Sequence, residues 1–155
     1  MDGLPCFRIG GDRHNYLQVE VLRHSHPGLA DFWDGNWLDA KVKIEAGGFK
    51  GSYSALLRSE DVLHFLNRLS AVYASSGGAN PIHTAEFATM KEQLGIVVKG
   101  DALGHFTADC AAVDNFSDGN RLEFELSFDQ TDIPAILDGL QRITKAFPVR
   151  GSSSG

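Results

Sequence analysis

Histidine offers the most direct chemistry in this sequence, because an imidazole can bind a metal ion or transfer a proton near neutral pH. The six histidines stand at positions 14, 24, 26, 64, 83 and 105. His24 and His26 would share a face in an extended segment, but a zinc site needs a third or fourth ligand, and no nearby cysteine or second spaced pair supplies one. We therefore expect the histidines to occupy ordinary polar positions, and we assign no metal-binding residue.

Nucleophilic and phosphate-binding motifs are missing from the sequence. It contains no G-x-S-x-G turn and no Walker loop, and Gly10-Gly11-Asp12 lacks the glycine spacing of a phosphate cradle. Glu123 and Glu125 point to one face of a predicted strand and could in principle do acid/base work. They stand on the polar side of an alternating pattern, which is typical of exposed strand carboxylates. We predict no catalytic residue, no cofactor and no enzymatic activity.

The segment from residue 24 to residue 39 combines aromatic and acidic side chains. Its aromatic residues Phe32, Trp33 and Trp37 stand among the carboxylates of Asp31, Asp34 and Asp39. Aromatic anchors dominate the energetics of protein interfaces, so this loop is a candidate recognition surface. The alternative is that both tryptophans tuck under a sheet edge and hold the loop. As candidate partner-binding residues we take Asp31, Trp33, Asp34, Trp37, Glu123 and Glu125.

Composition narrows the classes of partner. The chain has 155 residues, 43% hydrophobic, with a formal net charge of -6 and a pI near 5.4. This acidity argues against a nucleic-acid surface or an anionic membrane surface, and it is compatible with a basic protein partner. The two cysteines are too few for a disulfide framework, and no signal peptide or apolar run of about 18 residues is present. We predict a cytoplasmic protein with two reduced thiols.

Period-two alternation of apolar residues predicts strands over residues 16–22, 40–46, 49–55, 83–89, 94–99, 103–113 and 122–128. The second and third of these form a hairpin, because Gly47-Gly48 between them can supply the positive φ angles of a tight turn. The segment 24–36 reads as a loop.

Two amphipathic helices follow strands. Ser59 is expected to cap the first and Thr131 the second, and Pro134 is tolerated in a first helical turn. Gly139 costs about 1 kcal/mol relative to alanine, but each buried Ile or Leu stabilises the helix by roughly 1.5–3 kcal/mol, so the second helix should form. The expected buried stripes are Val62, Phe65, Leu66, Leu69, Val72 and Tyr73, and Ile133, Ile136, Leu137, Leu140, Ile143 and Phe147.

These elements predict an α+β fold, in which an antiparallel, meandering sheet of about six to seven strands is covered by the two helices. The order is roughly ββββ-α-ββββ-α, in which the positions of some strands are not assigned. Residues 1–150 form one domain, and residues 151–155 form a flexible tail or a cloning remnant. The helices align at one constant offset from Asp61 and Asp132. An internal duplication explains this, and so does the general pattern of capped helices that pack on a sheet.

An ordered set of segments resembles a known family. The segments are residues 37–44 (WLDAKVKI), 48–53 (GFKGSY), 59–61 (SED) leading into 65–69 (FLNRL), 122–124 (LEF), 128–131 (FDQT) and Phe147-Pro148. They look like the small bacterial proteins grouped with the WapI-type immunity proteins, over roughly residues 37–148. Immunity members of that family bind and neutralise a cognate toxin domain, often a nuclease. The resemblance implies no catalytic residue, and it leaves the N-terminal third unmatched.

Three functions remain in view. The first is a non-enzymatic immunity-like protein that binds a protein, for which a basic toxin domain is the hypothesis. The second is a small-molecule binder or enzyme with a pocket between sheet and helices, which would show convergent polar side chains with perturbed pKa values. The third is a homodimer joined through an exposed strand edge.

Overall fold

Eight antiparallel strands form two separate sheets in the computed structural model, which describes residues 3–153. One sheet, sheet A, has the order β1-β2-β3-β4, and the other, sheet B, has the order β5-β6-β7-β8. The strands of sheet A are β1 (Cys6–Asp12), β2 (Asn15–His24), β3 (Trp37–Ala46) and β4 (Phe49–Arg58). Those of sheet B are β5 (Thr84–Ala88), β6 (Leu94–Gly100), β7 (His105–Val113) and β8 (Arg121–Asp129).

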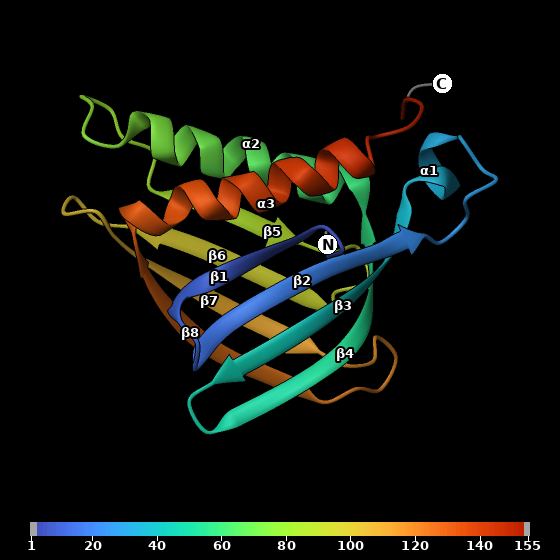
Figure 1. The fold of residues 1–155 in the computed structure, drawn as a ribbon, viewed down its shortest axis with the longest axis horizontal. Coiled ribbons are helices and arrows are strands. Elements are labelled where there is room, and N and C mark those ends of the chain that lie inside the picture. Colours follow the sequence, from blue (N-terminus) through green and yellow to red (C-terminus); the bar gives the residue numbers. More distant parts are fainter. Residues whose placement is uncertain (1–2, 154–155) are drawn as a thin grey trace.

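Two long helices lie side by side along one end of the sheets, as Figure 1 shows. They are α2 (Ser59–Ser75) and α3 (Ile133–Ala146), and the shorter elements are α1 (Phe32–Gly35) and a 3-10 turn, η1 (Gln130–Asp132). Each long helix crosses to the other half of the chain, because α2 follows β4 but packs on β5, and α3 follows β8 but packs on β1. None of the helices in the described part of the chain is long and apolar enough to span a membrane.

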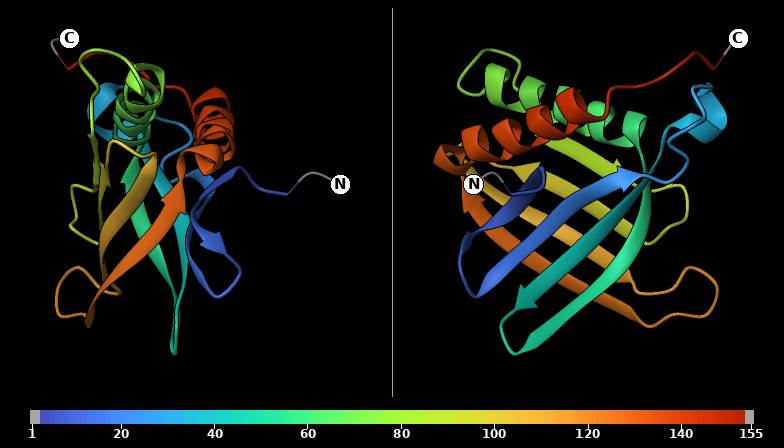
Figure 2. Two further views of the ribbon diagram at one scale, coloured as in Figure 1. Left: turned by 90° about the vertical axis from the view of Figure 1, so that its left-hand side faces the viewer. Right: turned by 45° about the vertical axis from the view of Figure 1, so that its right-hand side comes forward.

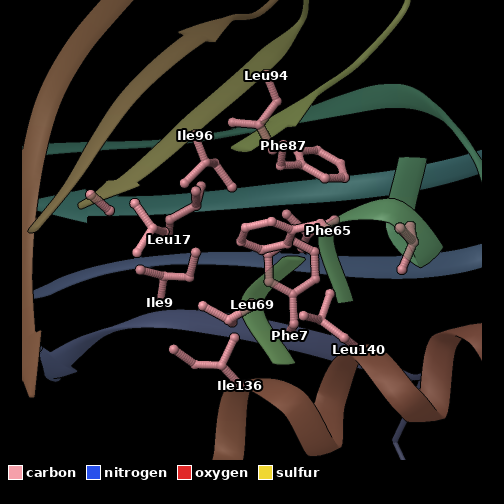
Figure 3. Packing of buried hydrophobic residues seen from close by; sticks show 14 of the residues in the cluster. Phe7, Ile9, Leu17, Phe65, Leu69, Phe87, Leu94, Ile96, Ile136 and Leu140 are labelled. Carbon is pink, nitrogen blue, oxygen red and sulfur yellow. The ribbon is translucent and has the colours of Figure 1, made fainter. Parts of the chain in front are cut away.

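The core fills the space between the two sheets and beneath the helices (Figure 2). Alternate residues of each strand point inward, since successive side chains of a strand face opposite ways. Phe7 from β1, Phe65 from α2 and Phe87 from β5 meet there, with ring centroids 5.6 to 5.9 Å apart. This aromatic cluster joins both sheets to a helix, as Figure 3 shows.

The α+β class predicted from the sequence is confirmed, and so is the order of the elements. The strands number eight rather than six to seven, and they form two sheets of four, with α2 between the two sets of strands in the sequence. β1 supplies the strand whose position the sequence left open. The hairpin of β3 and β4 is confirmed, with Gly47 at φ +62° in its turn, and the predicted loop 24–36 contains the short helix α1.

The helix stripes are confirmed, but both predicted caps are wrong. Ser59 lies inside the first turn of α2, and its buried hydroxyl has no hydrogen-bond partner among the described residues. Thr131 is exposed in η1, ahead of α3. Carboxylates perform the capping instead: Asp61 accepts from the Arg58 N–H and Asp132 from the Asp129 N–H. In the first stripe Tyr73 is exposed, and in the second Leu137 and Phe147 are only half-buried, with Phe147 just beyond the end of α3. The other residues of both stripes are buried.

The two halves of the chain repeat the order ββββα and begin their long helices in the same way. The Arg58 N to Asp61 Oδ2 distance is 3.2 Å, and the Asp129 N to Asp132 Oδ2 distance is 2.9 Å. The pairs occupy matching positions at the offset that relates the helical stripes. Internal duplication stays a hypothesis, and this shared capping is what supports it.

The close approach of α3 to β1 explains why this helix has a glycine, Gly139, in its middle. A Cβ atom at this position would lie 2.3 Å from the Cys6 carbonyl oxygen and 3.0 Å from the Phe7 Cα of β1. The helix therefore packs directly on the backbone of a strand, and only glycine leaves room for this approach.

Gly139→Ala should destabilise the protein although alanine favours a helix by about 1 kcal/mol. The added methyl group meets backbone, so we expect a net loss of about 1–3 kcal/mol in the free energy of unfolding, measured by urea denaturation. Gln141→Ala at an exposed position of the same helix is the control and should change stability little. A Gly139→Ala protein more stable than the wild type would contradict this packing.

Candidate protein-recognition surface

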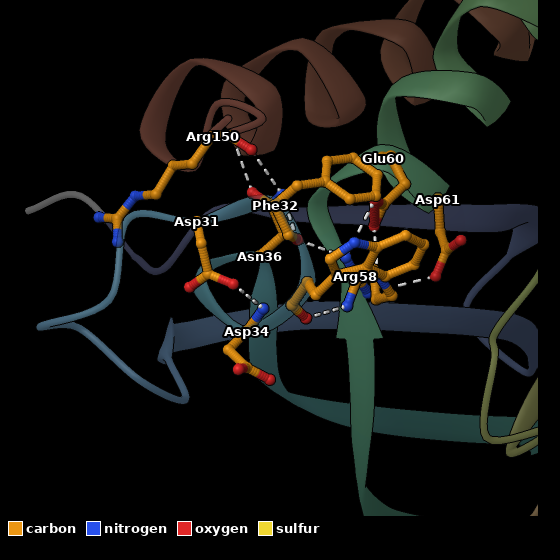
Figure 4. A network of polar contacts seen from close by, with 9 residues as sticks. Asp31, Phe32, Asp34, Asn36, Arg58, Glu60, Asp61 and Arg150 are labelled. Atoms are coloured by element: carbon orange, nitrogen blue, oxygen red, sulfur yellow. Dashed lines mark hydrogen bonds and ion pairs between the residues drawn. The ribbon is translucent and has the colours of Figure 1, made fainter. Parts of the chain in front are cut away.

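A buried guanidinium holds the loop that carries the candidate tryptophans. Arg58, at the end of β4, has only 1% of its surface exposed. Its Nη1 donates to the Trp33 carbonyl and its Nη2 to the Phe32 carbonyl, both at 2.6 Å, as Figure 4 shows for part of the network. The carboxylate of Glu60 pairs with Nε on the other side. Charge-assisted bonds of this kind fix the backbone of α1 against the end of the sheet.

Aromatic rings surround the same cation. The guanidinium carbon of Arg58 lies 4.9 Å from the ring centroid of Trp37, 5.2 Å from that of Phe32 and 5.8 Å from that of Trp33. Such cation–π contacts are worth more when water is excluded, as it is here. Burial also raises the pKa of Asp61, which caps α2 beside Arg58, to about 6.

The C-terminal segment closes the loop from its other side. Asn36 is fully buried, and its side chain donates to the carbonyls of Phe32 and Arg150 and accepts from the Arg150 N–H, at 2.8 to 2.9 Å. The Arg150 guanidinium reaches the Leu29 carbonyl and lies 3.0 Å from His24 Nε2. Burial and the charge of Arg150 lower the pKa of His24, so a neutral imidazole accepts this contact.

The predicted loop residues have separate positions. Asp31 caps α1 by accepting from the Asp34 N–H at 3.0 Å, and Asp34 itself is exposed. Trp37 is half-buried beside Arg58, while Trp33 is 56% exposed. Each of the two alternatives from the sequence therefore applies to one tryptophan. Trp37 helps to hold the loop, and Trp33 presents its side chain to solvent.

A row of alternating rings and cations extends this surface. The Lys91 ammonium lies 5.8 Å from the Trp37 ring centroid and 5.1 Å from that of Phe116. Phe116 and Met90 are each 58% exposed. We call Trp33, Trp37, Met90, Lys91 and Phe116 the aromatic end. The sequence patterns did not indicate three of these residues: Met90, Lys91 and Phe116. The one available signal was that Phe116 is an apolar residue within the polar turn NFSDGN.

The predicted carboxylates Glu123 and Glu125 stand on the outer face of β8, away from the core. Glu125 is directly opposite Asp109 of β7, and like charges in that position are destabilising. Lys99 pairs with Asp109 at 3.2 Å and Arg121 with Glu123 at 2.8 Å. Carboxylates still exceed cations on this outer side of sheet B, which we call the acidic face: Glu86, Asp109, Glu123, Glu125 and Asp129, against Lys99 and Arg121.

The loop between β7 and β8 connects the acidic face to the aromatic end. It begins after Val113 and returns at Arg121, which are paired residues, so Phe116 projects from the end of these strands. Because Lys91 lies near both Phe116 and Trp37, the loop meets the α1 segment at the same end of the molecule. The two groups of residues predicted separately from sequence thus belong to adjoining surfaces.

Another groove, with a volume of about 890 Å³, lies between β1 and α3. Its charged side chains are engaged: Arg8 stacks 3.8 Å above Tyr16, and Arg142 pairs with Asp138 at 3.1 Å. Burial raises the pKa of the Cys6 thiol that lines it, which makes that sulfur a poorer nucleophile at neutral pH. No group of three potential metal ligands occurs within residues 3–153.

The family model described as the immunity protein WapI-like family matches residues 8–148, nearly the whole chain. The chain belongs to this family. The match begins well before residue 37, so the N-terminal strands and the loop 24–36 of this WapI-like protein also lie inside it. No curated protein matches the sequence significantly.

Arg58→Lys should separate the role of the guanidinium fork from that of the charge. The single nitrogen of lysine lacks the planar fork by which Nε, Nη1 and Nη2 of Arg58 reach Glu60 and both carbonyls of α1. We therefore expect about 2–4 kcal/mol lower stability, measured by urea denaturation. The control is Arg142→Lys, whose side chain is 72% exposed in a surface ion pair and should cost less than about 1 kcal/mol. Equal effects of the two substitutions would contradict the anchoring role of Arg58.

Proposed function

We propose that this WapI-like protein is a non-enzymatic immunity protein that binds and neutralises a cognate toxin domain through the aromatic end. The observation that supports this most directly is the exposure of Trp33, Met90 and Phe116 on a rigid support. Binding hot spots are enriched in aromatic side chains that need little ordering when a partner arrives. Arg58 and Asn36 have already ordered the loop that carries Trp33.

The acidic face supports a basic partner. An excess of carboxylates on one side of a protein accelerates association with a positively charged surface. The opposite outer side, on sheet A, carries Arg8, Arg23, Lys41, Lys43 and Lys50 and is the more basic of the two. A basic toxin domain would therefore approach sheet B, beside the aromatic end. The free thiols of Cys6 and Cys110 fit a role in the reducing cytoplasm.

The first test measures binding to the toxin-like product of an adjacent gene by calorimetry. Trp33→Ala and Phe116→Ala should each weaken binding by about 2 kcal/mol or more, roughly thirtyfold in Kd. Leu103→Ala is the matched control, because this 81% exposed apolar residue lies at the other end of β7. If every neighbouring product fails to bind even at low salt, the toxin role is wrong.

The second test uses the charges of the acidic face. Glu123→Gln and Glu125→Gln should slow association, most strongly at low ionic strength, in stopped-flow measurements. Glu125→Gln should at the same time raise the free energy of unfolding by up to about 1 kcal/mol, because it removes repulsion from Asp109.

Asp138→Asn on α3 controls for net charge and should leave the association rate nearly unchanged. An association rate that responds equally to all three substitutions would show that overall charge, and not the acidic face, guides the partner.

A further inference from the structure

The outer edge of β4 presents unpaired backbone groups to solvent. β4 pairs with β3 alone, so one of its two edges has no strand beside it. An unprotected edge of this kind is a template for another strand, and proteins usually blunt it with proline, bulges or inward-pointing charges. Residues 49–54 contain no proline and a single charge, Lys50, and all of them except the half-buried Tyr53 are exposed.

Gln93 shows which groups of β4 point outward. Its side-chain amide donates to the Ser54 carbonyl at 3.1 Å and accepts from the Leu56 N–H at 3.0 Å, as a neighbouring strand would. The N–H and C=O of one residue point to the same side, and the side alternates along a strand. The backbone groups of Lys50 and Ser52 therefore also point outward, and within residues 3–153 they have no hydrogen-bond partner.

The stretch of β4 whose outward backbone groups have no partner, which we call the free run, is bounded at both ends. The turn at Gly47-Gly48 ends it on one side, and the Gln93 amide ends it at Ser54 on the other. An antiparallel strand that uses the whole run must be centred on Ser52. A second copy of β4 satisfies this register, since Ser52 then faces Ser52 of the copy, and Lys50 faces Ser54 of the copy.

Charge also favours a second copy. A groove of about 420 Å³ lies beside the edge on the outer face, lined by Ser54, Asp114 and the ion pair of Arg23 with Asp39 among others. The carboxylate of Asp114 accepts from Asn120 and forms no ion pair among the described residues. In the Ser52-centred register, Lys50 of the copy stands opposite Ser54, next to this groove, and no like charges are directly opposed.

We propose that two copies of this protein associate through antiparallel pairing of their β4 edges, centred on Ser52, with Lys50 of each directed to the Asp114 groove of the other. Two sheets A then form one continuous eight-stranded sheet. The exposed Phe49, 66% accessible in the single chain, gains apolar contact at the margin of this interface. Trp37 and Arg58 pair at the opposite end of the β3–β4 ladder, but Phe116 of the aromatic end lines the same groove as Asp114. The dimer therefore borders the aromatic end at Phe116, and it does not rest on the proposed function.

Analytical ultracentrifugation of the purified chain over a range of concentrations up to millimolar tests the dimer. The wild type should shift from monomer to dimer mass as concentration rises. Ser52→Pro should remain monomeric, because it removes the central outward N–H while sparing the bonds to β3. Ser52→Thr is the matched control and should still dimerise. A wild type that stays monomeric, or a Ser52→Pro protein that still dimerises, overturns the proposal.

The charge contact has its own variant. Lys50→Glu should weaken the dimer roughly threefold to tenfold, whereas Lys145→Glu on α3 makes the same change of charge without effect. If Ser52→Pro does not fold, amide hydrogen exchange of the wild type decides the question. The Ser52 and Ser54 amides should exchange more slowly as concentration rises, and exchange independent of concentration overturns the proposal.

Discussion

Burial of the Arg58 guanidinium is the interaction on which the order of the α1 loop and the aromatic end depends. A charge with 1% exposure is costly unless it is paired and hydrogen-bonded. Here Glu60 supplies the counter-charge, the carbonyls of Phe32 and Trp33 accept from the guanidinium, and aromatic rings cover it. The same contacts that satisfy Arg58 order α1, and this order gives Trp33 a defined position on the surface.

The packing of each long helix on the other half of the chain holds the two sheets together. Since α2 packs on β5 and α3 on β1, neither half of the chain completes its own core. The phenylalanines at positions 7, 65 and 87 meet where β1, α2 and β5 converge, and Gly139 lets α3 approach the backbone of β1. The two sheets are therefore locked into one body. A single body of this kind can hold the α1 loop, the turn at Lys91 and the loop of Phe116 at one end.

The acidic face shows a different balance of forces. A carboxylate of Glu125 opposite that of Asp109 lowers the stability of the sheet, and Lys99 offsets only part of the repulsion. Under the proposed function this unfavourable pairing would serve association with a basic surface, because negative charge beside exposed aromatic residues steers a positively charged partner.

The sequence by itself determined the local structure. Alternation along Ala40–Ala46 and Phe49–Ala55 predicted the hairpin, and stripes such as Val62, Phe65, Leu66 and Leu69 predicted the buried helix faces, because side-chain periodicity directly reflects backbone geometry. Ordered motifs also carried the family resemblance. The caps were wrongly assigned to Ser59 and Thr131, since Ser59 and Asp61 both suit the start of a helix and only the observed backbone chooses between them.

Only the tertiary structure decided how these elements meet. The division into two sheets, the crossing of the helices and the meeting of Arg58, Trp37, Lys91 and Phe116 all depend on contacts between residues far apart in the chain. Arg58 alone in a sequence is an ordinary strand-end cation. Its role appears when the fold removes it from water and leaves two carbonyls and a carboxylate within reach, because the burial of a charge is a property of its surroundings and not of its neighbours in sequence.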